Sequence, residues 1–437
     1  MKKLVLFLLF FLTACTQTAD TLPLADTTTV QATAVSNPDR VLTIAGRAGS
    51  ISDGLRSVIP EWEKATGYQV QLLELPYAYL QEKVFTDVLT GLGHYDVVFI
   101  DDPWLPALAG GGHLVPLAEF GYQPDPDFVS SSLDVSRWPP PYGPQPPHEA
   151  SDAQPELYAL PLIGNVQMFW YRQDLITEEP RNIMELMRVV EETADPANGL
   201  YGYAYLDGWG NPIVTEFNAW NWSYGGDIFN DEWEVVINRP KSVRALTDFI
   251  NYTQIVAPNQ GYDSGGGVLD TMLNGASLTA IVWPNQNTLI DDLSKSSVSG
   301  KIAVIPFPGG ERQTSQLGNW LLGIPVTSSN KQTAFDFIVW ATSHDTMFKL
   351  AQTGLPPTRE SIFEDEALAE DFWWLPQTHL ALQHATWRPR TPEWNKVESI
   401  LGNYLVQAMN EQMEPKQALD QAAAEITAVM QQAGYFD

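Results

Sequence analysis

The feature that most constrains the fold is an alternation of strand and helix patterns near the start of the chain. Residues 41–44, 68–75 and 97–100 are rich in β-branched and other apolar side chains, as buried strands are. Between them, apolar residues recur at helical spacing, first over 55–62 and then over 80–92. A strand–helix–strand–helix–strand order predicts an α/β protein with a mainly parallel sheet flanked by helices.

The third of these strands ends at a group of polar and aromatic side chains. Asp101 and Asp102 follow it directly, and Pro103 then prevents a further ladder hydrogen bond before Trp104. Open α/β sheets bind their ligands at the carboxyl ends of strands. Because carboxylates accept hydrogen bonds from hydroxyl groups and an indole stacks on an apolar C–H face, this stretch suits a sugar. The alternative is a solvated loop whose Trp104 fills the core.

The length and charge of the chain limit its organisation and its partners. The chain has 437 residues, which is longer than a domain with a single hydrophobic core usually is, so we expect two domains. It has 24 Lys and Arg residues against 53 Asp and Glu residues, a formal net charge of −29. Such a charge repels phosphate backbones, and we therefore expect no nucleic-acid partner.

The first 14 residues have the pattern of a signal peptide. Lys2 and Lys3 form a basic start, and the apolar run 4–12 is too short to span a bilayer as a mature helix. Residues 12–15, with the sequence Leu-Thr-Ala-Cys, resemble a bacterial lipobox, which implies cleavage before Cys15 and lipidation of that residue. The alternative is an ordinary signal peptide with an incidental cysteine. Cys15 is the only cysteine, which excludes disulfides and cysteine-ligated metals.

The stretch that follows is expected to be a flexible tether. Residues 15–40 are rich in Thr, Ala, Asp and Pro and show no periodicity. We find no later apolar run of transmembrane length. The sequence thus predicts an extracytoplasmic protein attached to the bacterial cell membrane through a lipid anchor only.

Two amides and several tryptophans are further candidate ligand-binding residues. Asn165 and Gln167 would share one face of a strand, and each amide can both donate to and accept from a sugar hydroxyl. The tryptophans expected at strand ends or in loops are Trp104, Trp209, Trp222, Trp283 and Trp320. For each of them the alternative is a large ring partly buried in the core.

The remaining patterns concern one loop and the C-terminal helices. Residues 138–148 contain six prolines and predict an irregular loop, which either overhangs a ligand or is only an insertion. Helical periodicity predicts helices at 331–342, 345–353, 394–413 and 415–432.

A search for catalytic chemistry finds little. The six histidines show no metal-binding spacing, and no G-x-S-x-G motif is present, so we expect no enzyme activity, metal or other cofactor. Asp101 and Asp102 are a candidate glycosidase pair, but consecutive strand residues point to opposite faces. A glycoside hydrolase or lyase stays open as an alternative.

The motifs in their order resemble one family. They are the lipobox, the strand of 95–104, Leu160-Pro161 before Phe169-Trp170-Tyr171-Arg172, Tyr224-Gly225-Gly226, Gly318-Asn319-Trp320, and the turn at 354–359. Together they resemble the extracellular solute-binding proteins of carbohydrate ABC importers, the maltose-binding-protein-like family. The Pro-rich loop and Pro60 depart from the family pattern.

The resemblance implies two lobes with a type II periplasmic-binding-protein fold and a ligand cleft between them. It implies a first lobe of 41–163 and 319–353 and a second of 164–318 and 354–437. It also assigns ligand contacts. These are Asp101, Asp102 and Trp104 on the first-lobe wall, Asn165 on the cleft wall, Trp283 as a stacking ring, Asn319 and Trp320 on a hinge-side strand, and the loop 387–394 with Arg388.

The sequence therefore favours a lipid-anchored receptor that captures a mono- or oligosaccharide and presents it to the transmembrane subunits of an ABC permease. Arg388 is expected to hydrogen-bond the sugar, although a structural ion pair is equally compatible with the excess of acids. A receptor for a non-sugar solute, such as a metal chelate or peptide, is the remaining alternative.

Overall fold

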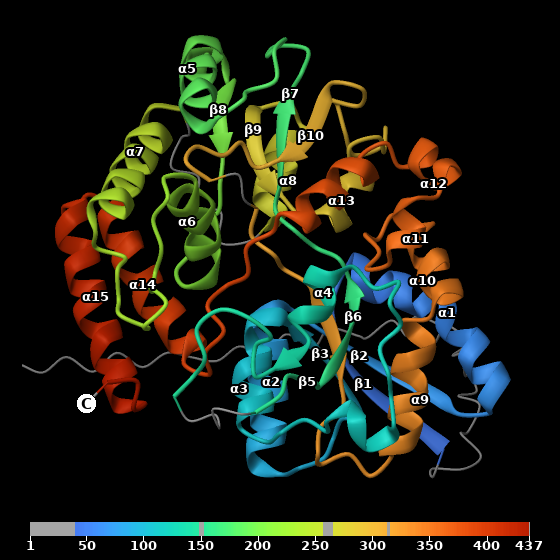
Figure 1. Ribbon diagram of the computed structural model, residues 1–437. Coiled ribbons are helices and arrows are strands. Elements are labelled where there is room, and N and C mark those ends of the chain that lie inside the picture. The colour runs from blue at the N-terminus through green and yellow to red at the C-terminus, as the bar shows by residue number, and fades with distance from the viewer. Residues whose placement is uncertain (1–39, 148–152, 257–264, 313–314, 437) are drawn as a thin grey trace, which may run out of the picture. The chain divides into compact units, whose positions relative to one another are not determined.

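The computed structural model describes residues 40–147, 153–256, 265–312 and 315–436 (Figure 1). The expected signal peptide, Cys15 and nearly all of the tether lie outside the described residues. The described part contains two main β-sheets with helices packed on them.

The first sheet has five strands in the order β2-β1-β3-β11-β6. Their bounds are β1 Val41–Arg47, β2 Gln69–Leu75, β3 Val97–Asp101, β6 Ala159–Ile163 and β11 Trp320–Gly323. β1 pairs in parallel with β2 and β3, whereas β11 runs antiparallel to both β3 and β6. β11, which lies between β3 and β6, comes from a part of the chain remote from both of these neighbours.

The second sheet has four strands in the order β10-β7-β9-β8. Their bounds are β7 Met168–Arg172, β8 Tyr201–Ala204, β9 Ser277–Val282 and β10 Ile302–Pro306. β8 and β9 are parallel, while β7 is antiparallel to β9 and β10. A short ribbon of β4, Arg137–Trp138, and β5, Glu156–Leu157, stands apart from both main sheets.

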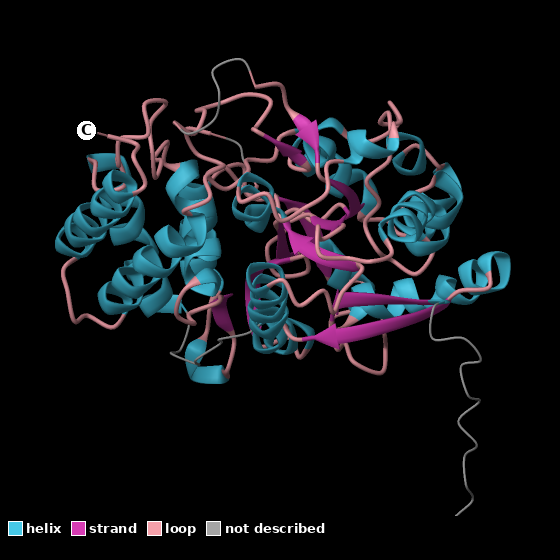
Figure 2. Cartoon of the chain, turned by 90° about the horizontal axis from the view of Figure 1, so that it is seen from below, coloured by secondary structure: helices cyan, strands magenta, loops and turns pink. Residues whose placement is uncertain are grey.

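Helices connect and cover the strands (Figure 2). Those up to residue 134 are α1 Ser50–Thr66, α2 Tyr77–Thr90, α3 Leu105–Gly110 and α4 Ser130–Asp134. Those between residues 183 and 273 are α5 Ile183–Thr193, α6 Asn211–Ser223, α7 Pro240–Val256 and α8 Gly265–Leu273. The C-terminal ones are α9 Lys331–Ala341, α10 His344–Ala351, α11 Glu360–Phe363, α12 Glu366–Asp371, α13 Leu375–Gln383, α14 Trp394–Met409 and α15 Pro415–Gln432.

Short 3₁₀ helices complete the secondary structure. They are η2 Asp102–Trp104, η3 Leu117–Phe120, η4 Pro196–Asn198 and η5 Pro284–Leu289. Among the helices of the described residues, none combines the length and apolarity needed to cross a bilayer.

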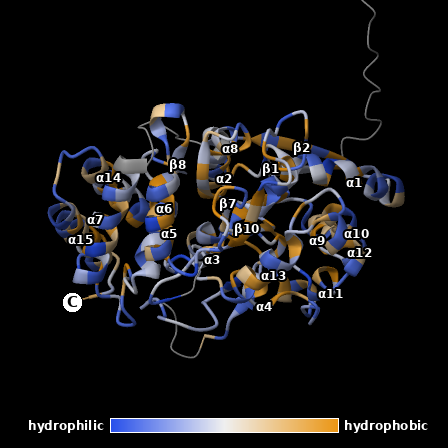
Figure 3. Ribbon diagram, turned by 90° about the horizontal axis from the view of Figure 1, so that it is seen from above, coloured by the Kyte–Doolittle hydropathy of each residue, from blue (hydrophilic) through white to orange (hydrophobic). Residues whose placement is uncertain are grey.

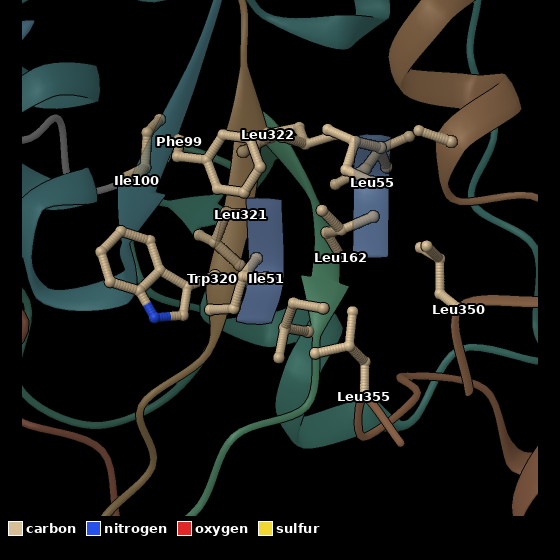
Figure 4. Close-up of a cluster of buried hydrophobic side chains, with 14 of the residues drawn as sticks. Ile51, Leu55, Phe99, Ile100, Leu162, Trp320, Leu321, Leu322, Leu350 and Leu355 are labelled. Carbon is tan, nitrogen blue, oxygen red and sulfur yellow. The ribbon is translucent and has the colours of Figure 1, made fainter. Parts of the chain in front are cut away.

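Two apolar clusters form the core. The first packs the first sheet against α1 and α10, and Figure 4 shows Phe99, Leu162 and Leu322 of β3, β6 and β11 beside Leu55 of α1. The second lies under α5–α7, α14 and α15. Alternate residues of β7 face different clusters, as a strand's period of two requires. Helices such as α9 and α15 carry both hydrophobic and hydrophilic residues in Figure 3, because only one side of each is buried.

The structure confirms most expected elements and corrects two predictions. α9, α10 and α15 lie where helical periodicity predicts them. Each sheet is mainly parallel, as predicted, and contains one reversed strand, β11 in the first sheet and β7 in the second. Trp222 lies in α6 and not in a loop. The apolar residues of α6 are buried on every side, so the sequence shows no one-sided stripe there. The second correction concerns Asp101 and Asp102 and is given below.

Candidate functional site

The carboxyl end of β3 carries a buried ion cluster. Arg388 donates to both oxygens of Asp101, at 2.9 and 3.2 Å, and to Oδ2 of Asp102 at 3.1 Å. All three side chains are buried. The two carboxylates converge because β3 ends at Asp101 and a 3₁₀ helix begins at Asp102. This corrects the expectation that they point to opposite faces.

A second arginine fixes the backbone next to this cluster. Arg390 donates to the carbonyl oxygens of Asp102, at 2.7 Å, and Val135, at 2.8 Å. The backbone N–H of Asp102 donates to the carbonyl of Asn319 at 3.1 Å. The side chain of Asn319 is fully buried, and neither of its polar atoms has a hydrogen-bond partner among the described residues. Two arginines therefore hold the end of β3 from the segment between α13 and α14.

Aromatic rings surround the ion cluster. Tyr77, at the start of α2, donates its hydroxyl proton to Asp101 at 2.7 Å. Its ring lies 5.2 Å from that of Trp104 and 6.0 Å from that of Trp320. Trp104 is 0% exposed and Trp320 is 6% exposed. In this conformation protein atoms therefore cover both indoles.

Further titratable groups lie close to the cluster. Glu398 of α14 accepts a hydrogen bond from Asn211 of α6 at 2.9 Å. Burial raises the pKa of Glu398 to about 7, although Arg388 and Asn211 oppose the shift. Burial also raises the pKa of Tyr77, and the negative charge of Asp101 adds to that effect. Side chains of α2 and α14 therefore lie next to the cluster.

Three segments run side by side between the sheets. Bridges join Val166 to Leu317 and Gln316 to Thr386, so the links β6–β7, β10–β11 and α13–α14 are neighbours. Gln167 donates to the carbonyl of Thr215 at 2.8 Å and accepts from the backbone N–H of Gln316. The side chain of Gln167 is therefore occupied by protein partners.

Asn165 takes part in a different set of contacts. It donates to Asn285 Oδ1 at 2.9 Å, and Asn285 donates to Ser50 at 2.9 Å. Ser50 starts α1 beside the first sheet, whereas Asn285 follows β9 of the second. The neighbouring Trp283 is partly exposed, and its ring packs on Gly318, where an added Cβ would lie 2.4 Å from the indole.

The other two candidate tryptophans lie in separate surroundings. Trp209 is 62% exposed in the loop between β8 and α6. Trp222 is 1% exposed, and its Nε1 donates to Asp227 at 3.2 Å. The structure thus brings Asp101, Asp102 and Arg388 into one cluster and places Trp222 in another. Ligand contact by any of these residues stays a prediction.

Sequence reasoning missed several members of these networks. No sequence motif marks Tyr77, Asn285 or Glu398 as part of a site. Only their hydrogen-bond partners in the structure identify them. The one available signal was Asn285, which directly follows Trp283-Pro284 at the end of an apolar strand.

The two sheets and their connections define the class of protein. A solved, maltose-bound protein of T. maritima superimposes with a TM-score of 0.79 at 23% identity, covering 89% of this chain and 99% of that one. This likeness confirms the expected two-lobe, type II fold of periplasmic binding proteins.

A model of the bacterial extracellular solute-binding protein family matches residues 48–348. This match spans more than half of the chain, and the protein belongs to that family. A probable amino-acid ABC transporter periplasmic-binding protein of Sinorhizobium fredii is 22% identical over 405 residues, covering 89% of this chain and 88% of the relative. A mannitol-binding protein of Pseudomonas aeruginosa is 24% identical over 391 residues, covering 82% of this chain and 85% of the relative.

Proposed function

We propose that this protein captures a mono- or oligosaccharide outside the cytoplasm and delivers it to the transmembrane subunits of an ABC importer. The observation that carries the proposal is the family match over residues 48–348 together with carbohydrate- and polyol-binding relatives. Partly exposed tryptophans, Trp209 and Trp283, supply flat apolar faces of the kind that stack on sugar rings.

Two lobes are proposed to close on the ligand by a hinge motion. The first comprises 41–163 and 319–353, and the second comprises 164–318 and 354–437. Membership of the two sheets supports this division, because β11 joins β1–β3 and β6 while β7–β10 form the other sheet. The three adjacent connecting segments are the proposed hinge.

The protein is further proposed to be lipid-anchored through Cys15. The support is the lipobox-like Leu-Thr-Ala-Cys sequence at 12–15, after a basic and apolar leader. The tether of 15–40 would then let the receptor reach its permease while attached to the membrane.

An amino-acid ligand is the second candidate. The Sinorhizobium fredii relative, described as a probable amino-acid binder, favours it. An amino acid needs partners for both an ammonium and a carboxylate group. Asp101 and Asp102 already pair with Arg388, and Arg390 lies 4.0 Å from Asp102 as a second cation. We favour the sugar because these ionic groups are already paired. The same pairing also disfavours a hydrolase that uses these two aspartates.

A thermal-shift screen separates the candidates, because a ligand that binds only the folded state raises the melting temperature. The panel contains maltose, maltotriose, galactooligosaccharides, mannitol, ribitol and the common amino acids. We expect a carbohydrate to raise the melting temperature. A rise with amino acids alone would refute the sugar assignment. Release of monosaccharides from the oligosaccharides by purified protein would instead support an enzyme.

A further inference from the structure

The Pro-rich loop forms an ordered structure. Gln145 donates through its side-chain amide to the carbonyl oxygens of Pro140, at 3.0 Å, and Gly143, at 3.3 Å. Gly143 has φ 84°, which favours glycine at the bend. Prolines on both sides of Tyr142 restrict the backbone further. We call residues 139–147 the strap.

A tryptophan from elsewhere in the fold anchors the strap. The indole Nε1 of Trp233 donates to the carbonyl of Gln145 at 3.0 Å. Trp233 is itself 6% exposed and packs edge-on against Phe229 and Tyr435, with ring centroids 5.3 and 5.1 Å away. The strap is therefore fixed to a packed part of the protein.

The strap presents one aromatic ring to solvent. Tyr142 stacks on Trp387, with ring centroids 4.2 Å apart and an interplanar angle of 17°. Although Trp387 covers one face, the tyrosine is 53% exposed, so its opposite face is open. Trp387 directly precedes Arg388, the arginine that binds the end of β3. An ordered ring with an open face thus stacks on the residue that precedes Arg388.

We propose that Tyr142 is a ligand-binding residue whose open face stacks on a pyranose ring. The cyclic sugar has a flat C–H face that matches an aromatic surface, and the tyrosine hydroxyl can also bond a sugar hydroxyl. Because the strap and Trp387 already hold the ring, binding requires little further ordering. An acyclic polyol has no such flat face. The strap therefore selects cyclic sugars over open-chain alditols, an inference that rests on the proposed function.

The test is isothermal titration calorimetry of the full mature chain with maltose, maltotriose and mannitol. Tyr142→Ala is expected to weaken binding of the pyranose sugars about three- to tenfold. Tyr142→Phe retains the ring and is expected to bind within about twofold of the wild type. Tyr79→Ala is the matched control, since Tyr79 is 60% exposed on α2. Circular dichroism melting verifies that each variant is folded.

The outcomes separate this inference from the proposed function. Weaker pyranose binding by Tyr142→Ala alone supports the inference. Unchanged binding, or tighter binding because the tyrosine merely covers Trp387, would overturn it while sugar binding by the wild type stands. Binding of mannitol but of neither sugar would also overturn it. If the wild type binds no carbohydrate at all, the proposed function fails and this inference fails with it.

Discussion

The guanidinium of Arg388 donates to both carboxylate oxygens of Asp101, although the two residues lie 287 positions apart. Both side chains are almost fully buried. Removing the arginine would leave buried carboxylates without their counter-charge, which is more costly than the pair is stabilising. Arg388→Met is therefore expected to lower the free energy of unfolding by about 3–5 kcal/mol, measured by urea denaturation.

The control for that variant is an exposed ion pair. Arg188 and Glu192 of α5 pair at 2.7 Å with both side chains more than half exposed. Arg188→Met should change the free energy of unfolding by less than about 0.5 kcal/mol. Equal effects of the two substitutions would contradict a stabilising role for the buried cluster.

Trp283 and Gly318 are expected to be coupled. Trp283→Ala should weaken sugar binding about ten- to hundredfold, if stacking is worth roughly 1–3 kcal/mol. Gly318→Ala would place a methyl group 2.4 Å from the indole and displace it. In a double-mutant cycle, Gly318→Ala should therefore reduce affinity in the wild type but have little effect when residue 283 is alanine. Additive losses would show that the two residues act independently.

A buried glutamate should make stability depend on pH. Glu216 accepts from the Tyr203 hydroxyl at 2.6 Å, and burial raises its pKa from 4.5 to about 8. Between these values the folded state binds more protons than the unfolded state, so stability falls as pH rises from about 4.5 through 8. Glu216→Gln should flatten this fall and gain at least about 1.4 kcal/mol relative to the wild type from pH 5 to 8.

Urea denaturation at pH 5 and at pH 8 measures this change in the free energy of unfolding of Glu216→Gln. Glu191→Gln, on the exposed side of α5, is the control and should leave the pH dependence unchanged. A parallel pH profile of Glu216→Gln and the wild type would show that Glu216 stays ionised in the fold.

Substitution of the buried Trp104 and of the exposed Trp209 should affect stability differently. Trp104→Ala removes a 0% exposed ring and should cost about 3–5 kcal/mol of stability. Trp209 is 62% exposed, so Trp209→Ala should stay within about 0.5 kcal/mol of the wild type. Thermal melting distinguishes the two. If Trp209→Ala also lowers sugar affinity, the ring contacts the ligand and not the core.

Cys15→Ser tests the proposed anchor. Without the thiol the chain cannot be lipidated at this position, so it should be released from membranes or retain its leader. Membrane fractionation and gel mobility in the native host provide the measurement. Unchanged membrane retention and mobility would contradict anchoring through Cys15.

The elements with one-sided patterns were predictable from the sequence. α15 has the predicted bounds of 415–432, because Pro415 fits the first turn and apolar residues repeat on one side. α6 was not predictable, since residues on all its sides are buried and no stripe marks its axis. β11 is antiparallel to β3 because of the direction in which the chain re-enters the first sheet. The hydrophobic periodicity of the sequence carries no information about that direction.

The site was predictable only in part. The strand end at Asp101 and Asp102 follows from the apolar run and Pro103. Whether Arg388 contacts a ligand or an acid was open in the sequence, and the structure shows the ion pair. The role of Tyr77 depends on a contact between side chains 24 positions apart, which no local pattern signals.

The topology of the first sheet also has a consequence for synthesis. β6 ends at Ile163, but its partner β11 begins only at Trp320. Because β11 lies between β3 and β6, a chain emerging from the ribosome presents both strands with unpaired edges until Gly323 has been made. The first sheet can therefore be completed only after the strands of the second sheet have been translated. During that interval the nascent chain can bind chaperones, and it can also aggregate.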